Sequence, residues 1–570
     1  MIRTIDISEM QCFNSAPRLK FEWNLRMPAD QPKKTSRTSS NAPSIFNDSI
    51  GPVMRGASSS HCAAAHRIGS LCLDLLDGKI TSLVAEYDIN GALVSTHKGQ
   101  GTDMGLYSGI LGYEVDDDRL QHFDKGIAEA GIHVEVKYLD YGATHPNNYK
   151  LSIANATENH LIEAISIGGG MIEIQKIDGA SVSMAGDYYE LLVFCNDDSE
   201  AIADYLSESL NYEFLETHSS DTATFIEIKS TVDFDLELLQ ILKNNSSVQS
   251  VKVLKPVLPI LARSDLHVPF INCVQMLEYN QGKDLELWQL AVKYESERGA
   301  ISADDVFEKM RVIAHIMSNS IQLGIAGTEY ADRILPAQAP LLKAATEKKS
   351  IPDDIVNRMT LYTTAMMDVK SSMGVIVAAP TAGSCGTLPG ALFGAASYLQ
   401  KNEDETVKAL LAAGLIGVFI AAHSTFAAEV AGCMAETGSG GAMAAAGLTH
   451  LLGGNLNQAL NASARTLGAS LGLVCDMIGD RVEVPCMDKN ISAASKAYAN
   501  TITSIASYTD VIPLDEVIDS MFEVGNMMPR ELCCTGLGGL ATSPTGLIVL
   551  QRLNATPAEA RVSGQFWKSC

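Results

Sequence analysis

Short runs in which apolar and polar residues alternate dominate residues 45–185. Alternation with a period of two is typical of strands that bury one face. It predicts strands at 82–87, 133–138, 149–153 and 172–177, with one helix at 62–76. We therefore expect an α+β domain here. It follows a polar, Ser- and Thr-rich segment, residues 1–44, which we expect to form an extension outside the fold.

Residues 186–255 follow a different order of patterns. An apolar run at 191–194 precedes a helical pattern at 201–210, and alternation at 225–228 precedes a second helical pattern at 236–242. A final apolar run lies at 251–254. This order predicts a βαββαβ module, about the size of a small ligand-sensing domain.

From residue 264 to residue 570 the pattern is helical and rich in Ala, Gly and Met. The longest apolar stretch, residues 409–422, has fourteen residues, whereas a bilayer requires roughly twenty, so we expect a buried helix. In another predicted helix, Leu456, Leu460, Leu467 and Leu471 share one face. The same spacing extends that face to Cys475.

Composition and charge narrow the class of protein. A chain of 570 residues is too long for one domain, and 46% hydrophobic with 19% charged residues is typical of a globular protein. The net charge of −25 disfavours nucleic acid and anionic membranes as partners. The twelve cysteines are scattered, and no secretory signal is recognisable at the N-terminus, so we expect a reducing compartment, the cytoplasm.

Cys433, Cys475 and Cys486 lie in the helical part, and Cys570 is the last residue. None of them has the C-x-x-C spacing of a zinc ribbon. Buried free cysteine is a common core residue, which is one interpretation. The other is that several thiolates converge on a soft metal centre.

Several motifs, taken together and in this order, resemble the bacterial iron–sulfur L-serine dehydratases from about residue 49 to residue 541. The motifs include those around Cys433, Cys475 and Cys486, together with Ser58-Ser59-Ser60-His61, Gly101-Thr102-Asp103, His145-Pro146-Asn147 and Thr381-Ala382-Gly383.

The resemblance implies a multidomain α+β architecture. Residues 45–185 would form the β-type domain, 186–255 an ACT-like βαββαβ module, and 264–570 the mostly helical catalytic domain. It also implies a 4Fe-4S cluster on Cys433, Cys475 and Cys486, with one iron open to the substrate. Cys570 matches a terminal cysteine that covers the open iron in some members, although a solvent-exposed thiol is equally consistent with the sequence.

Such an enzyme would eliminate hydroxide from L-serine and release pyruvate and ammonia. An iron with an open position is a Lewis acid for the departing oxygen, and an imidazole suits removal of the α-proton. His61 and His145 are the candidate bases. Ser58, Ser59, Ser60, Thr102, Asp103, Asn147 and the loop Thr381-Ala382-Gly383 are candidate substrate-binding residues. A helix cap at His61 and ordinary turns at His145 and Thr381 are the structural alternatives.

Several positions depart from the family pattern. Gln100 stands where the family has a proposed catalytic His, and Gln cannot accept a proton. His61, His145 or the nearby His97 would then act as base, or the α-proton is not what is removed. Arg481 would bind a second anionic group of a larger substrate or is a surface charge, and Cys533-Cys534 replaces Arg-Glu.

Three functions therefore remain open from the sequence. The first is L-serine deamination, and the second is lyase activity on another β-hydroxy or β-substituted amino acid. The third is a non-catalytic amino-acid sensor. In each case we expect a small-molecule amino acid as ligand, no nucleic acid, no membrane, and a homodimer formed by edge-to-edge pairing of the ACT-like modules.

Overall fold

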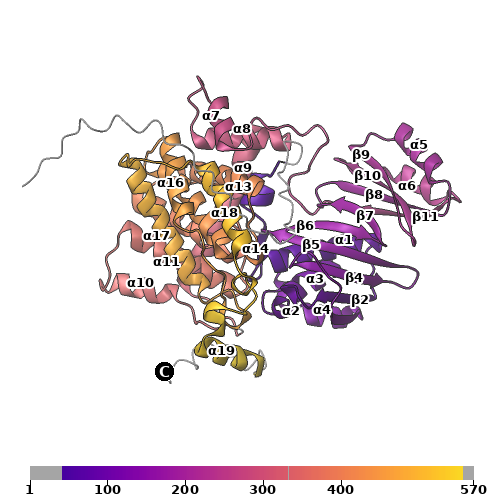
Figure 1. The fold of residues 1–570 in the computed structure, drawn as a ribbon, viewed down its shortest axis with the longest axis horizontal. Helices are drawn as coiled ribbons and strands as arrows, with labels where there is room; N and C mark the ends of the chain where they lie inside the picture. Colours follow the sequence, from indigo (N-terminus) through magenta and orange to yellow (C-terminus); the bar gives the residue numbers. More distant parts are fainter. Residues whose placement is uncertain (1–41, 332, 556–570) are drawn as a thin grey trace, which may run out of the picture. The chain divides into compact units, whose positions relative to one another are not determined.

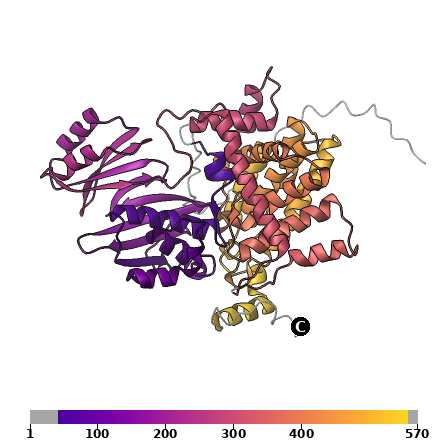
Figure 2. The same cartoon turned by 180° about the vertical axis from the view of Figure 1, so that it is seen from behind.

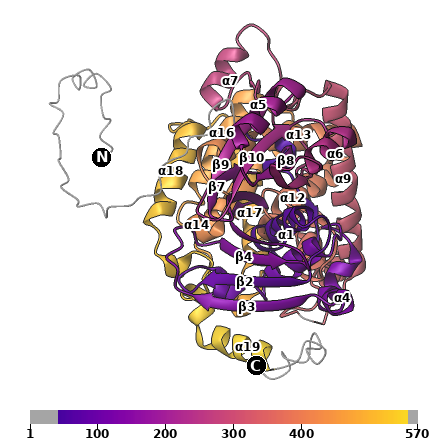
Figure 3. The ribbon, with the colours of Figure 1, turned by 90° about the vertical axis from the view of Figure 1, so that its right-hand side faces the viewer.

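A six-stranded sheet forms the framework of the N-terminal part of the chain. The computed structural model describes residues 42–331 and 333–555. The sheet order is β3-β2-β4-β5-β6-β7, with β2 and β3 parallel and all other neighbours antiparallel. Figure 3 shows β4, β2 and β3 side by side in that order. The strands are β2 (Ser82–Asp88), β3 (His133–Leu139), β4 (Asn148–Ala154), β5 (Asn159–Gly168), β6 (Met171–Ile177) and β7 (Ala180–Met184).

Helices α1 (Ala64–Leu75) and α3 (Thr102–Ile110) pack together and share one apolar core with the sheet. Two shorter helices, α2 (Leu93–Thr96) and α4 (Phe123–Ala130), complete this part. The four predicted strands are confirmed, whereas β5 and β7 were not predicted. The predicted helix 62–76 begins as a π-helical turn, Ser59–Ala63, and continues as α1.

The predicted βαββαβ order is confirmed in the next part. Its sheet has the order β11-β8-β10-β9 and is antiparallel throughout. The two helices share a core with one face of the sheet, whereas Leu192, Phe194 and Phe225 belong to the core of the six-stranded sheet. The elements are β8 (Tyr189–Cys195), α5 (Ser199–Ser209), β9 (Phe214–Ser219), β10 (Thr224–Ser230), α6 (Leu236–Lys243) and β11 (Val248–Leu254).

The rest of the described chain is mostly helical (Figures 1 and 2). It consists of α7 (Cys273–Tyr279), α8 (Leu287–Gly299), α9 (Ala303–Ala326), α10 (Ala339–Glu347), α11 (Ile355–Ser371), α12 (Thr387–Leu399), α13 (Glu403–His423), α14 (Ala428–Cys433), α15 (Ser439–Leu451), α16 (Leu456–Gly468), α17 (Cys486–Ile505), α18 (Leu514–Met527) and α19 (Pro544–Ala555).

Helix α13 contains the predicted buried stretch 409–422 and packs against α8, α9 and α15. Among the described residues it alone is long and apolar enough to cross a membrane. However, 83% of its most apolar window is buried inside the protein, as expected for a core helix.

Residues 45–63 join the helical core although they precede the six-stranded sheet in the chain. Ile45, Phe46 and Ile50 are buried in that core, and β1 (Val53–Met54) pairs with β12 (Ile376–Val377). Residues 42–44, predicted to lie in the extension, are also buried, because Ser44 caps the turn Ile45–Ser49 and donates a hydrogen bond to Glu295. Residues 1–41 lie outside the described residues.

The prediction that one helical face continues from Leu456 to Cys475 is wrong. Helix α16 ends at Gly468, and Leu471 is 36% exposed. Gly472 then adopts a positive φ of 79°, which redirects the chain. Cys475 therefore lies in a loop, and its position depends on tertiary contacts rather than on helical periodicity.

Candidate functional site

Three predicted cysteines from three separate elements lie in one buried region. Cys433 ends α14, Cys475 lies in the loop after α16, and Cys486 begins α17. All three are at most 5% exposed. The ligand atoms of Cys433, Cys475 and Glu436 lie within 4.8 Å of one another, and the Cys486 thiol is coupled electrostatically to Cys433. The predicted Cys570 lies outside the described residues.

Burial and neighbouring thiols disfavour the thiolate forms of Cys475 and Cys486 in the absence of a cation. Hydrogen bonds with Cys433 and Cys534, together with burial, raise the pKa of Cys475 well above its usual value. Burial likewise raises the pKa of Cys486. A bound metal cation reverses this preference, because it coordinates the thiolate form. The group Cys433, Glu436 and Cys475 is thus able to hold a metal ion.

The loop geometry around Cys433 depends on a glycine. Gly432 has a φ of 62°, in the left-handed region, and a Cβ there would lie 2.7 Å from the Leu473 carbonyl oxygen. The Met434 N–H donates to that same carbonyl at 3.0 Å. This close approach places the loop that contains Cys475 beside the end of α14.

His61 lies in the π-helical turn and is fully buried. Its Nδ1 lies 3.0 Å from the Ser58 hydroxyl and 3.4 Å from a Glu429 carboxylate oxygen, and its Nε2 lies 2.8 Å from the Thr96 hydroxyl. Burial, with a smaller contribution from His97, lowers the pKa of His61 to about 3. His61 is therefore neutral at physiological pH.

Glu429 and Asn147 face each other next to His61. Burial raises the pKa of Glu429, and the Asn147 side chain partly opposes this effect. Apart from this contact with each other, the Asn147 amide and one oxygen of Glu429 have no hydrogen-bond partner among the described residues. Unpartnered buried groups of this kind cost free energy, and they are typical of sites that bind a polar ligand.

The other predicted residues of the six-stranded part differ in their surroundings. His145 is half-buried, accepts a hydrogen bond from the Asn147 N–H at 3.1 Å, and has a pKa lowered to about 4 by burial. Asp103 lies 2.8 Å from His97 Nδ1, and Tyr138 lies 2.7 Å from His97 Nε2. Both nitrogens of His97 are thus occupied. Thr102 is fully buried at the start of α3.

The predicted loop Thr381-Ala382-Gly383 contacts the π-helical turn that contains His61. It also contacts Glu436, which lies beside Cys433 and Cys475. The Ala382 N–H donates to the Ser59 hydroxyl at 3.2 Å, and Thr381 donates to Glu436 at 2.7 Å. A Cβ at Gly383 would lie 2.6 Å from the Glu436 carboxylate, so a larger residue there would require that carboxylate to move. Burial raises the pKa of Glu436 to about 7. Ser60 is also buried in the turn.

Gln100 points into the cysteine region. Its side-chain amide lies 2.8 Å from the Met477 sulfur and 3.5 Å from the Cys534 sulfur, and it is 1% exposed. Arg481 is half-buried, and its guanidinium lies next to Gly99, one residue before Gln100. Two positions at which the sequence departs from the family pattern, Gln100 and Cys534, therefore lie together beside Met477.

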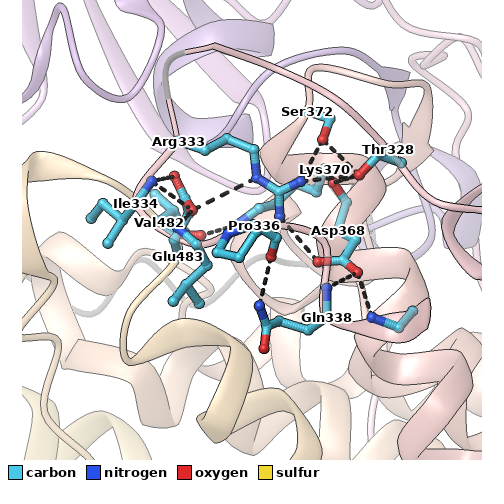
Figure 4. Close-up of polar contacts among 12 residues, drawn as sticks. Thr328, Arg333, Ile334, Pro336, Gln338, Asp368, Lys370, Ser372, Val482 and Glu483 are labelled. Atoms are coloured by element: carbon cyan, nitrogen blue, oxygen red, sulfur yellow. Dashed lines mark hydrogen bonds and ion pairs between the residues drawn. The ribbon is translucent and has the colours of Figure 1, made fainter. Parts of the chain in front are cut away.

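A buried ion-pair network fixes the loop before Cys486 (Figure 4). Arg333 pairs with Asp368 at 3.0 Å, and both side chains are at most 1% exposed. Glu483 accepts hydrogen bonds from the N–H groups of Ile334 and Leu335, and Lys370 donates to the Val482 carbonyl. These contacts hold residues 482 and 483 against α11.

Comparisons with known proteins match the helical part of this chain to one family. Residues 282–541 match the family model described as "Serine dehydratase alpha chain". The "Probable L-serine dehydratase, alpha chain" of Bacillus subtilis is 34% identical over 278 residues, which are 49% of this chain and 93% of that protein. The chain belongs to the L-serine dehydratase family.

The similarity to this serine dehydratase family extends beyond the alpha-type part. The L-serine dehydratase of Helicobacter pylori is 25% identical over 524 residues, covering 87% of this chain and 97% of that protein. The alpha chain from Peptoniphilus asaccharolyticus is 33% identical and covers 48% of this chain. The family-model match includes Cys433, Cys475 and Cys486, whereas His61 lies before it.

Sequence reasoning did not single out Glu429, Glu436 or Thr96 as site residues of this serine dehydratase. Glu436 lies three residues after Cys433, and this short spacing from a candidate ligand was the available signal. Glu429 lies four residues before Cys433, one helical turn away. Thr96 gave no sequence signal, because only the fold brings it to His61.

Proposed function

We propose that this chain converts L-serine to pyruvate and ammonia by β-elimination at a 4Fe-4S cluster held by Cys433, Cys475 and Cys486. The observation that carries the proposal is that three buried thiols from separate elements meet beside buried acid–base groups. The relatives named L-serine dehydratase support the choice of substrate.

The donor set fits such a cluster. Thiolates are soft ligands that favour iron–sulfur centres over hard cations. The cluster site would be sheltered from water, because each of the three cysteines is buried. When bound, a cluster with an open iron supplies a Lewis acid for the departing hydroxide.

The chain's own residues would orient the amino acid. The π-helical turn with Ser58 and Ser59 is linked to the Thr381 loop by the Ala382 N–H, which gives a frame of hydroxyl and N–H groups. The unpartnered Asn147 amide and Glu429 oxygen supply further polar contacts. Groups of this type suit the carboxylate and ammonium of a small amino acid.

We assign the removal of the α-proton to His61. Its burial keeps the imidazole neutral and so able to accept a proton. Glu429, 3.4 Å from Nδ1, is placed to stabilise the imidazolium that forms, and Ser58 and Thr96 hold the ring. His97 stays the alternative base: Asp103 and Tyr138 hold both of its nitrogens, as Ser58 and Thr96 hold those of His61.

A second candidate function is the same chemistry on a different β-hydroxy or β-substituted amino acid. The observation that favours it is the group of Gln100, Met477 and Cys534 beside Cys475. These residues would alter the shape and polarity of the site next to the substrate. Arg481, near Gly99, would add a positive charge for a substrate with a second anionic group.

Anaerobically prepared full-length protein with measured iron and sulfide tests these proposals. Equal amounts of pyruvate and ammonia from L-serine support the first. Turnover only of L-threonine or another β-hydroxy amino acid supports the second. Amino-acid binding without any turnover contradicts both and favours a sensor.

We also propose that the protein acts in the cytoplasm as a homodimer, without nucleic-acid or membrane partners. The βαββαβ module would be the ACT-like, amino-acid-sensing part. Its sheet ends in the edge strands β9 and β11, which are available for pairing with a second copy. Light scattering of the purified protein measures the oligomeric state, and a monomer would contradict the proposal.

A further inference from the structure

A fourth thiol, that of Cys534, lies in the same buried region as Cys433 and Cys475. Cys534 is 4% exposed and belongs to one small buried cluster with Cys433, Cys475 and Met477. The Cys475 and Cys534 thiols are hydrogen-bonded to each other. A sulfur atom that touches a candidate ligand so directly is placed to bind the same centre.

The backbone fixes this contact. Cys475 forms a parallel bridge with Cys533, in which the Cys475 N–H donates to Leu532 at 2.8 Å and the Cys534 N–H donates to the Cys475 carbonyl at 3.1 Å. The segment with Cys534 therefore runs alongside Cys475 and cannot slide relative to it without losing both hydrogen bonds.

The two adjacent cysteines have different surroundings. The Cys533 thiol is directed to the Val430 carbonyl oxygen, 3.7 Å away. The Cys534 sulfur instead lies 3.5 Å from the Gln100 amide nitrogen and 3.9 Å from the Met477 sulfur. Cys533 is therefore a matched control for Cys534, with the same residue type and nearly the same burial.

Cys534 also has a strained backbone. Its φ is 61°, in the left-handed region that non-glycine residues other than Asn and Asp rarely adopt. Such strain costs free energy and collects at functional sites. Here the hydrogen bonds to Cys475 hold the residue in this conformation.

We infer that Cys534 supplies a fourth sulfur ligand to the cluster proposed above, and that the Gln100 amide positions this sulfur. The inference rests on the proposed cluster but not on the identity of the substrate. In the resting protein the fourth iron would then carry Cys534, and an amino acid would have to take its place. Thiolate ligation of all four irons protects a cluster from losing one of them.

Controlled oxidation tests the inference without using activity. One equivalent of ferricyanide converts [4Fe-4S]2+ into [3Fe-4S]+, Fe2+ and one electron, and the electron reduces ferricyanide to ferrocyanide. The paramagnetic [3Fe-4S]+ product is measured by electron paramagnetic resonance and normalised to the iron and sulfide content before oxidation. Wild type, Cys534→Ser, Cys533→Ser and Cys570→Ser are compared, each as anaerobic full-length protein.

We expect Cys534→Ser to form severalfold more three-iron cluster than wild type, and Cys533→Ser to equal wild type. Failure of Cys534→Ser alone to retain iron, with the thermal midpoint unchanged, also supports the inference. Equal yields from Cys534→Ser and Cys533→Ser would overturn it, as would an increase only in Cys570→Ser.

A second variant tests the positioning role of Gln100. Gln100→Leu removes the amide but keeps similar volume, so we expect an intermediate yield of three-iron cluster with full initial iron content. A yield equal to that of wild type contradicts this role. If wild-type protein contains no iron and sulfide, the proposed cluster itself fails, which is distinguishable from a normal cluster insensitive to Cys534.

Discussion

Two buried polar regions of the helical part differ in how completely their groups are paired. In the network of Arg333, Asp368 and Glu483, each charge faces an opposite charge or backbone N–H donors, although Arg333 Nε has no hydrogen-bond partner in the described part of the chain and lies 3.9 Å from the Glu483 carboxylate (Figure 4). Beside the cysteines, Glu429 and Asn147 retain polar atoms without hydrogen-bond partners among the described residues.

The difference separates a scaffold from a binding site. Paired buried charges hold segments in one arrangement, and removing one partner leaves the other uncompensated. Unpaired buried groups lower stability, so they persist where a ligand satisfies them. The network fixes Val482 and Glu483, a few residues before Cys486. The buried ion pairs therefore help to position the cysteine region.

The largest expected effect is that of Cys475→Ser on the cysteine region. It should remove most of the bound iron and lower kcat/KM by about 1,000-fold or more, because the Lewis acid is lost. Iron content and pyruvate formation measure this. Cys72→Ala, a buried cysteine of α1 outside the site, should keep its iron. Equal iron in both variants would remove Cys475 from the ligand set.

His61→Asn should leave the iron content unchanged and lower kcat by about 100- to 10,000-fold, the usual contribution of a positioned acid–base group. Steady-state kinetics with L-serine on protein of known iron content measures this. His145→Asn, at a half-buried position, should have a smaller effect. A normal kcat for His61→Asn would show that another group accepts the proton.

The substitution Asp368→Asn removes one negative charge from the buried network of Arg333, Asp368 and Glu483. It leaves the buried Arg333 guanidinium with only the more distant Glu483 carboxylate, 3.9 Å from its Nε, which should destabilise the protein by about 3 kcal/mol. The midpoint of urea unfolding, followed by circular dichroism, measures the change. Glu129→Gln, in the exposed pair with Lys125, should change stability by less than about 1 kcal/mol. Similar midpoints for the two variants would contradict the assigned scaffold role.

A smaller effect is expected from pH on the cluster-free protein. Burial lowers the pKa of His61 from 6.5 to about 3. The unfolded chain therefore binds the proton more readily between these values, and stability is complete above pH 6.5 and falls as the pH decreases. At pH 5 the loss attributable to His61 should be about 2 kcal/mol. Urea midpoints at pH 7 and pH 5 should differ less in His61→Asn than in wild type.

Much of the fold could be predicted because local patterns and burial agree. The alternating runs gave four strands of the six-stranded sheet, and the stretch 409–422 identified the core helix α13. Strands β5 (Asn159–Gly168) and β7 (Ala180–Met184) were missed, although β7 alternates buried and exposed residues. The prediction of one helical face from Leu456 to Cys475 was wrong, because the spacing of apolar residues does not show where a helix ends.

The sequence predicted which types of residue the candidate site contains. It did not predict which residues contact each other. Cys433, Cys475 and Cys486 were identified from motif spacing, and the structure places them in one region. The contact between Gln100 and Cys534 joins residues 434 positions apart, and nothing local indicates it. His97 stays an open alternative, because the fold brings hydrogen-bond partners to both nitrogens of His97 and of His61 alike.

The pairing of β1 with β12 has a consequence for synthesis. Val53 meets Val377, so the apolar segment 45–54 leaves the ribosome tens of seconds before its partner, at about 5–20 residues per second. During that interval Ile45, Phe46 and Ile50 have no core to enter. Nascent chains of this protein should therefore engage a chaperone at this segment until translation reaches the helical half.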